Sequence, residues 1–170
     1  LSETYWAKTF EIFREASENH GTRGRLDVAM VTIEEAWRRI DAVKDLPVGW
    51  RVHALVARAN CASRVKQTDA VVRHVKAALA LGKVHSKALG NAKILGVVPR
   101  ILGHLERTGE RELAEQLVQG FIASHRKLAE SSALLALALE LGAAHYARIS
   151  NGFKSRALFE EALQMHTKVV

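Results

Sequence analysis

The strongest constraint on this chain is a helix-packing pattern that recurs about every 40 residues along its whole length. Each occurrence is a pair of mostly small residues seven positions apart, and the first members of successive pairs are separated by 41, 44 and 41 residues. A repeat of this period predicts stacked helical hairpins, because each hairpin buries its apolar face against its neighbours. Such arrays expose long surfaces and usually act by binding. The four pairs are Ala29 with Ala36, Ala70 with Ala77, Ala114 with Phe121, and Ser155 with Ala162.

The composition fits a folded, helix-rich chain. Of the 170 residues, 48% are hydrophobic, 11 are glycine and 2 are proline. Good helix formers such as Ala, Leu, Glu, Arg and Lys dominate, so long helices are expected and disorder is not. No apolar run reaches the roughly 18–20 residues that cross a bilayer as a helix.

Two features bear on where such a chain works. Cys61 is the single cysteine, which excludes an internal disulfide and favours a reducing compartment. We therefore expect an intracellular, most simply cytoplasmic, location. The sequence begins at Leu1 instead of Met, which we interpret as a domain excised from a larger protein whose targeting segments lie elsewhere.

Apolar periodicity and glycine- or proline-containing breaks predict eight helices in four antiparallel pairs, and no strand. The predicted helices span about 3–19, 25–44, 50–64, 69–82, 85–107, 110–127, 130–149 and 153–168. The four pairs occupy about 1–46, 47–84, 85–128 and 129–170 of one repeat domain.

Proline and glycine affect two of these helices. Pro99 falls inside the predicted helix 85–107, where it removes a backbone hydrogen bond and clashes with the preceding turn. That helix is therefore either kinked near Pro99 or split, with Pro99 opening a second piece. Gly82 is expected to end the helix 69–82.

The last pair resembles a known family. The segment 156–163 looks particularly like the second helix of a tetratricopeptide repeat. Two departures are that Ala143 stands where glycine is usual and that no proline closes the unit. The unit is also longer than the family's usual 34 or so residues, and is closer to a roughly 42-residue variant seen in kinesin light chains. The residues with the family's spacing are Leu139, Ala143, Tyr146, Ser155, Phe159 and Ala162.

The resemblance implies an all-α, right-handed solenoid of four antiparallel helix pairs. In that family the first helices of successive pairs line a concave groove that binds a partner protein. Aromatic residues at the repeat positions fill the space between hairpins, so we expect them in the core. The aromatic residues expected there are Tyr146, Phe159, Trp6, Trp37 and Trp50.

Positive charge is concentrated in one stretch of the chain. The net charge is −2 over residues 1–50, zero over 101–170 and +9 over 51–100, where Asp69 is the one acid. Such a block attracts an acidic peptide, a nucleic acid or an anionic surface, unless it is simply a solvated flank. The basic block consists of Arg51, Arg58, Arg64, Lys66, Arg73, Lys76, Lys83, Lys87, Lys93 and Arg100.

We expect part of this block to bind a partner protein or peptide, and an acidic segment would complement its charge. Arg51 and Arg58 lie seven residues apart and share a face of the helix 50–64, with Asn60 nearby. Lys87 and Asn91 lie four apart on the helix 85–107. Arginine and lysine would meet carboxylates, and asparagine would hold a peptide backbone.

Alternative interpretations stay open. The same side chains could be ordinary solvated positions on helices. A basic helical repeat could instead bind nucleic acid, with an affinity that falls steeply with salt. A third interpretation is a regulatory domain, or a scaffold that associates with itself because an array without polar end caps stacks on its own ends.

An enzyme is the least favoured class, because catalytic and cofactor patterns are missing from the sequence. The eight histidines include no i, i+4 pair, and Cys61 is the only thiol, so we expect no metal. No glycine-rich phosphate motif follows a strand, so we expect no nucleotide cofactor. Adjacent carboxylates such as Glu34 and Glu35 point about 100° apart on a helix and do not converge. We expect no catalytic residue.

Overall fold

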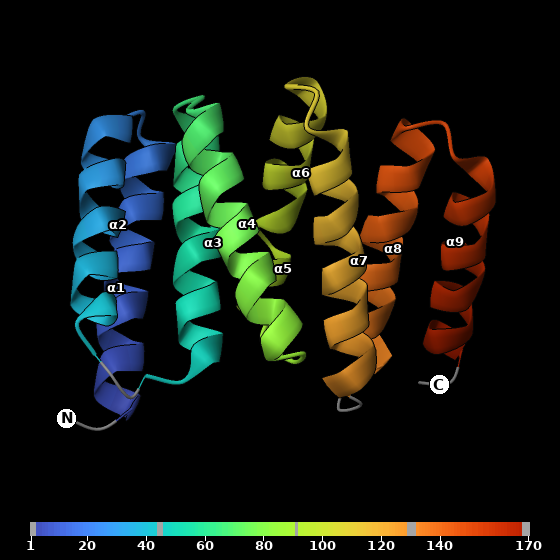
Figure 1. Ribbon diagram of the computed structural model, residues 1–170, viewed down its shortest axis with the longest axis horizontal. Helices are drawn as coiled ribbons and strands as arrows, with labels where there is room; N and C mark the ends of the chain where they lie inside the picture. The colour runs from blue at the N-terminus through green and yellow to red at the C-terminus, as the bar shows by residue number, and fades with distance from the viewer. Residues whose placement is uncertain (1–2, 44–45, 91, 129–131, 168–170) are drawn as a thin grey trace.

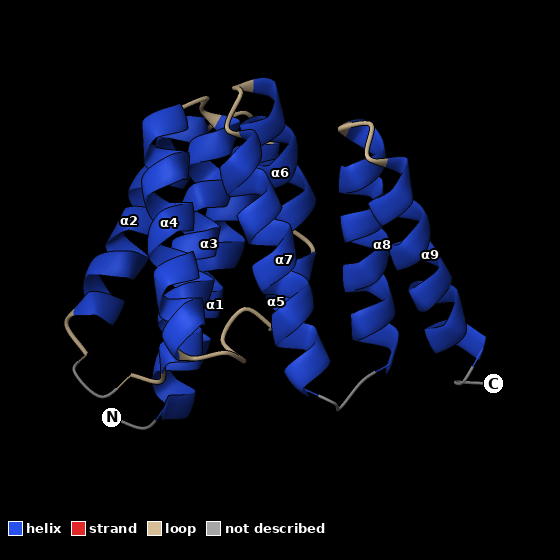
Figure 2. Cartoon of the chain, turned by 45° about the vertical axis from the view of Figure 1, so that its right-hand side comes forward, coloured by secondary structure: helices blue, strands red, loops and turns tan. Residues whose placement is uncertain are grey.

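The chain is all-α, as predicted. The computed structural model describes residues 3–43, 46–90, 92–128 and 132–167, and within these ranges it contains nine helices and no strand (Figures 1 and 2). The helices are α1 (Glu3–Thr22), α2 (Leu26–Asp41), α3 (Val48–Arg64), α4 (Thr68–Val84), α5 (Ala92–Leu95), α6 (Val98–Arg107), α7 (Arg111–Leu128), α8 (Ser132–Arg148) and α9 (Gly152–Thr167).

The helices form hairpins that lie side by side in chain order (Figure 1). The hairpins are α1–α2, α3–α4, α6–α7 and α8–α9, and neighbouring hairpins are joined by contacts of α2 with α3, α4 with α6 and α7, and α7 with α8. In Figure 1 the helices α4 and α7 lie in front of α3 and α8. The helices α4, α7 and α9 run in the same direction, so their carboxyl ends lie at the same edge of the row.

The same turn closes all four hairpins. In each turn one residue has a positive φ, and these residues are 42, 43 and 41 positions apart. The next residue donates its backbone N–H to a carbonyl five positions earlier, as in Arg25 to His20 (2.9 Å) and Asn151 to Tyr146 (2.8 Å). This is the bond that caps a helix before the chain reverses. The left-handed residues are Gly24, Lys66, Gly109 and Ser150.

The region around Pro99 differs from the single helix predicted for 85–107. Residues 85–90 form a turn, α5 is a single helical turn, and α6 begins at Val98 with Pro99 in its first turn. Of the two alternatives the split is confirmed, because proline fits the first turn of a helix, where its missing N–H needs no partner. Gly82 does not end α4, which continues to Val84.

Two clusters of buried apolar residues hold the hairpins together. One extends from α3 to α9, and a smaller one joins α2 to α3. Most of the predicted small packing residues are in the core, including Ala162, which is 2% exposed. Of the eight predicted packing residues, Ala77 is only partly buried. The repeat pattern therefore identified real contacts between helices.

The aromatic residues were predicted less well. Tyr146 is 4% exposed, which confirms its predicted burial. Phe159 is 49% exposed, so its predicted burial is wrong, because it lies on a side of the last helix, α9, that no described helix covers. Trp37 and Trp50 are partly buried at the edge of the smaller cluster. The side chain of Trp6 lies outside the described residues.

Candidate functional site

The two arginines predicted to bind a partner make contacts within the fold instead. Arg58 donates two hydrogen bonds to the carboxylate of Glu34 on α2, at 2.8 and 2.6 Å. Its guanidinium also lies 4.8 Å from the ring centroid of Trp37. Both contacts fasten α3 to α2, so this side chain has a structural role between the first two hairpins.

Arg51 also joins α3 to the end of α2. It donates to the backbone carbonyl of Val43 at 2.9 Å and lies 3.7 Å from Asp41. Asn60 is 2% exposed, and its amide oxygen accepts a hydrogen bond from Arg100 at 3.1 Å. Neither residue presents its polar group on an open face of α3.

The other two predicted residues lie elsewhere. Lys87 is exposed but sits in the turn after α4, so it is not on a helix as predicted. Asn91 lies outside the described residues. The predicted set of five is therefore not brought together on one described surface.

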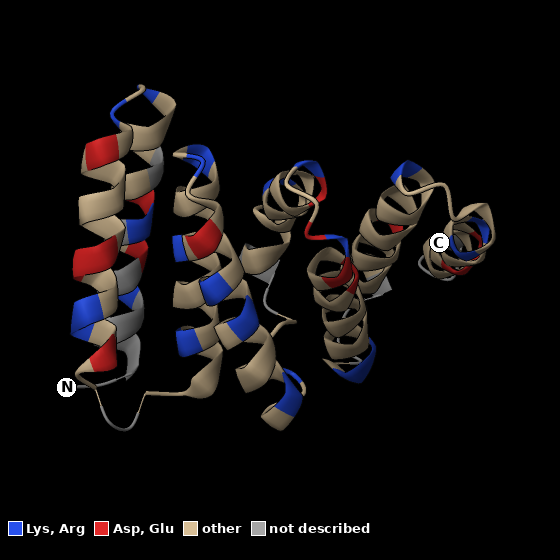
Figure 3. Cartoon of the chain, turned by 45° about the horizontal axis from the view of Figure 1, so that its top comes forward, with Lys and Arg blue, Asp and Glu red and all other residues tan. Residues whose placement is uncertain are grey.

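The described side chains of the basic block do not form a single patch. Lys66 lies in the turn before α4 and Arg73 in its first half, whereas Lys83 lies in its last turn and Lys87 in the turn that follows. Figure 3 shows basic residues scattered over several helices. A nucleic-acid interface would need many cations on one face to follow the phosphates. The observed arrangement does not favour that interpretation.

A groove that the sequence did not predict lies across α4, α7 and α9. It consists of two adjoining hollows on either side of α7, of about 360 Å³ between α4 and α7 and about 270 Å³ between α7 and α9. The face belongs to the second helices of the hairpins, whereas the family resemblance pointed to the first helices. The first volume is at the lower end of the range found for small-molecule pockets, roughly 300–1,000 Å³, and the second is just below it.

The α4–α7 hollow owes its depth to two glycines. A Cβ atom at Gly120 would lie 3.2 Å from side-chain carbons of both Leu79 and Leu89. A Cβ atom at Gly82 would lie 2.8 Å from Leu89. The missing side chains leave an apolar floor, and Lys83 and Lys127 are among the polar residues around it. Neither lysine is paired with an acidic side chain among the described residues.

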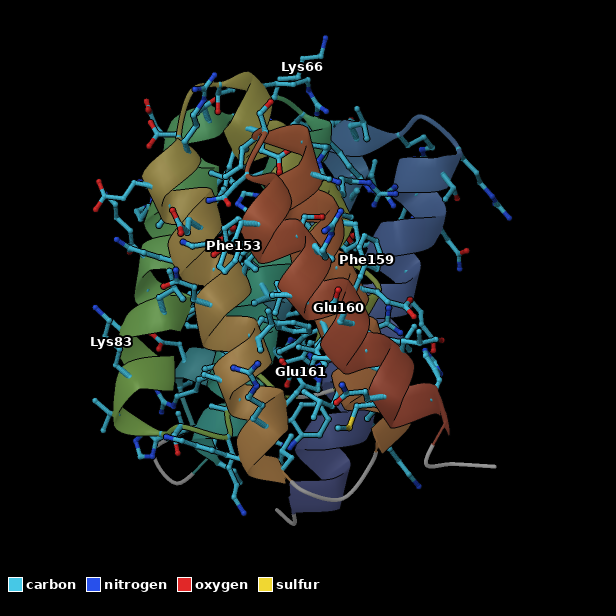
Figure 4. All side chains as sticks on the ribbon, turned by 90° about the vertical axis from the view of Figure 1, so that its right-hand side faces the viewer. Lys66, Lys83, Phe153, Phe159, Glu160 and Glu161 are labelled. Carbon is cyan, nitrogen blue, oxygen red and sulfur yellow. The ribbon has the colours of Figure 1, made fainter. Side chains whose placement is uncertain are left out.

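The α7–α9 hollow is mostly apolar. Ile122 from α7, Leu158 from α9 and the ring of Tyr146 from α8 line it. Phe153, which also lines it, is 87% exposed and lies on the side of α9 that faces α7 (Figure 4). The largely exposed ring of Phe153 extends the apolar surface of this hollow.

Two ion pairs span the α7–α9 hollow. Lys154 of α9 donates to Glu115 of α7 at 2.7 Å, and this bond holds the pKa of the Glu115 carboxyl below its usual value. Arg126 of α7 makes two bonds to Glu161 of α9, at 3.2 and 2.5 Å. The hydroxyl of Tyr146 also donates to Glu115 at 3.1 Å. These bonds fix the separation of the two helices.

The two hollows form one groove because Gln119 and Ala123 of α7 line both of them. Ala123 is exposed and small, so the ridge between the hollows is low at this point. The described lining residues include four basic side chains and no acidic one. A sequence signal was present, since Gly120 and Ala123 interrupt the polar face of a helix with small residues.

No other feature of the described residues indicates chemistry. They contain no group of three or more potential metal ligands. None of the helices among them is long and apolar enough to span a membrane. Several buried histidines have partners within the fold, for example His125, whose Nδ1 lies 2.9 Å from the carbonyl of Phe121 in its own helix.

Comparisons with known proteins identify the fold alone. No protein-family model matches the sequence, and no curated protein is significantly similar to it. The structure is similar to the crystal structure of BtubC (BKLC) from P. vanneervenii, with a TM-score of 0.69 over 98% of this chain and 72% of that one. The two sequences are 14% identical over this match, which relates their folds and carries no function.

Proposed function

We propose that this chain is a protein-interaction module, a right-handed solenoid of tetratricopeptide type that holds a segment of a partner protein. The observation that carries the proposal is the continuous groove across α4, α7 and α9, with exposed Phe153 at its edge. The identical turns at a period of 41–43 residues support the repeat assignment. The proposal includes no catalytic step, cofactor or metal, and the cytoplasmic location stays a prediction.

Site-specific photocrosslinking tests the proposal. A photoreactive phenylalanine at Ala123 places the probe inside the groove, and the same substitution at Ala147, exposed on α8, is the matched control. We expect a discrete protein adduct from position 123 and none from position 147. Equal adducts at both positions would count against the groove, and a nucleic-acid adduct would favour the alternative of a basic nucleic-acid-binding repeat.

Self-association is a second candidate function, favoured by the last hairpin. Leu137 on α8, and Phe159 and Leu163 on α9, are 44%, 49% and 65% exposed. Phe159 and Leu163 are four residues apart and therefore share a face. Sedimentation equilibrium of the wild type and of Leu163→Glu tests this function, because an oligomer built on this face should become monomeric in the variant.

A further inference from the structure

We infer that the occupant of the groove is an acidic amphipathic α-helix of a partner protein, with two apolar side chains about seven residues apart that enter the two hollows. This inference rests on the proposed function and adds the conformation and chemistry of the partner segment. It is based on the charge of the groove, on its hydrogen-bonding groups and on its dimensions.

The charge of the lining indicates an acidic partner. Lys83 and Lys127 stand beside the α4–α7 hollow without an acidic partner among the described residues. The two cations of the other hollow, Arg126 and Lys154, are already paired with glutamates. Carboxylates on the incoming segment would therefore pair mainly with the two lysines and would fix its register along the groove.

The hydrogen-bonding groups of the groove favour a helix over an extended peptide. An extended segment needs partners for its backbone N–H and C=O groups, which a helix satisfies internally. Gln116 and Gln119 are the amide side chains of the groove, and both donate to glutamates of their own helix, Glu112 at 3.2 Å and Glu115 at 3.1 Å. These amides are engaged and do not offer a ladder for an extended backbone.

The dimensions fit a helix that crosses α7. The two hollows are separated by one helix, which is about 10 Å wide, and residues seven apart on an α-helix are separated by about 10.5 Å along the axis. Such a pair lies on one face, so one side chain can enter each hollow. The close approach needs a low ridge, which Ala123 provides.

Three synthetic peptides test the inference in NMR titrations of the isotope-labelled protein. The first peptide is an amphipathic sequence of about 18 residues, which is long enough for partial helicity. It carries Phe and Leu seven residues apart on one face and glutamates on the flanks of that face. The second replaces the glutamates with lysines. The third keeps the acidic composition but has central prolines that prevent a helix.

We expect the first peptide to shift the amide signals of Lys83, Gly120, Ala123 and Phe153 and the other two peptides to bind at least about tenfold more weakly. Ala123→Trp should weaken the first peptide at least about tenfold by filling the ridge, whereas Ala147→Trp should not. The double charge reversal Lys83→Glu with Lys127→Glu should also weaken binding of the first peptide at least about tenfold. The matched charge reversal of exposed Lys8 and Arg156 should have little effect on that binding.

The results distinguish the inferred acidic helix from the more general proposal that the groove binds a partner segment. If the proline-containing peptide binds the groove as well as the helical one, the groove still binds a partner segment but the inferred helix is wrong. If the lysine peptide binds as well as the acidic one, the inferred charge is wrong. If none of the peptides shifts groove signals at millimolar concentration, both the inference and the proposed function lose their support.

Discussion

His145, which is fully buried in α8, places its Nδ1 2.7 Å from a carboxylate oxygen of Glu106 in α6. Arg148, three residues later, makes two further bonds to the same carboxylate, at 2.8 and 3.0 Å. One acidic side chain thus receives donors from two positions of the next hairpin. Burial alone would raise the pKa of Glu106, but the bonds from Arg148 and His145 outweigh burial and hold the pKa below its usual value.

The first prediction concerns this junction. Glu106→Gln removes the charge that these donors need, so the free energy of unfolding should fall by about 1.5–3 kcal/mol. Urea denaturation at pH 7 measures the change, and Glu160→Gln on the exposed side of α9 is the control. Because the pKa of Glu106 is lowered in the folded chain, its contribution to the free energy of unfolding is fully present above about pH 4.5 and is lost as the pH falls further. An unchanged midpoint for Glu106→Gln would contradict the role of this carboxylate.

The second prediction concerns Arg58. Its side chain is 15% exposed, and that of Glu34 is 38% exposed, so the pair is partly screened by solvent. Arg58→Ala should lower the free energy of unfolding by about 1–2 kcal/mol, through the lost bonds and the lost contact with Trp37. The side chain of Arg38 is 76% exposed, so Arg38→Ala, which breaks its pair with Glu35 within α2, should cost no more than about 0.5 kcal/mol. Lost partner binding at unchanged stability would instead restore the predicted binding role of Arg58.

The third prediction is a pH dependence from His74. Burial, followed by the nearby charge of Arg58, lowers the pKa of His74 from 6.5 to about 4. Below pH 6.5 the unfolded chain therefore binds a proton at His74 that the folded chain does not bind until the pH approaches 4. The free energy of unfolding should fall between pH 6.5 and 4 and then level off. The full effect is about 3 kcal/mol.

Urea denaturation between pH 7.5 and 4 measures this slope. His74→Leu should flatten it, and His85→Leu, at an exposed turn position, should leave it unchanged. Part of the slope should remain in the first variant, because burial also lowers the pKa of His104. Identical slopes in the wild type and in His74→Leu would mean that this histidine does not titrate as expected.

The fourth prediction compares two glycines inside helices. A Cβ atom at Gly142 would lie 2.7 Å from Ile122 and 3.0 Å from Leu158, so Gly142→Ala should overpack the α7–α8–α9 junction and cost about 1–3 kcal/mol. A Cβ atom at Gly103 would meet only the far end of Arg107, at 3.3 Å. Gly103→Ala should therefore stabilise α6 by up to about 1 kcal/mol. Thermal denaturation of both variants measures the contrast, and equal shifts would argue against the close packing at Gly142.

The helices and their period could be predicted from the sequence because they depend on local information. Apolar spacing defines each helix, and the left-handed turn residues recur at nearly the period of the small packing residues. The start of α6 was also foreseeable, since Pro99 limits the backbone to a helix break or a first turn. The turn at 85–90 was not, because it depends on Leu89 packing against Gly82 and Gly120 from two other helices.

The site could not be predicted because it depends on pairings between distant residues. Nothing in the sequence indicates that Arg58 would be neutralised by Glu34, 24 residues earlier, or that Lys83 and Lys127 would lie beside one hollow. Charge density along the chain is therefore a poor guide to charge density on the surface. Phe159 matched a repeat position, but burial at that position needs a following hairpin on its outer side.

The ion pairs between α7 and α9 have a consequence for how the groove responds to its surroundings. The hollow between these helices is spanned by Lys154 with Glu115 and Arg126 with Glu161, and both pairs are partly exposed. The reach of such charges shrinks from about 8 Å at physiological ionic strength to about 3 Å at 1 M salt, whereas apolar contacts between α3 and α4 are not weakened in this way. The two ion pairs that hold α7 and α9 at their separation therefore weaken as salt is added, so the width of the hollow between these helices depends on the ions around it.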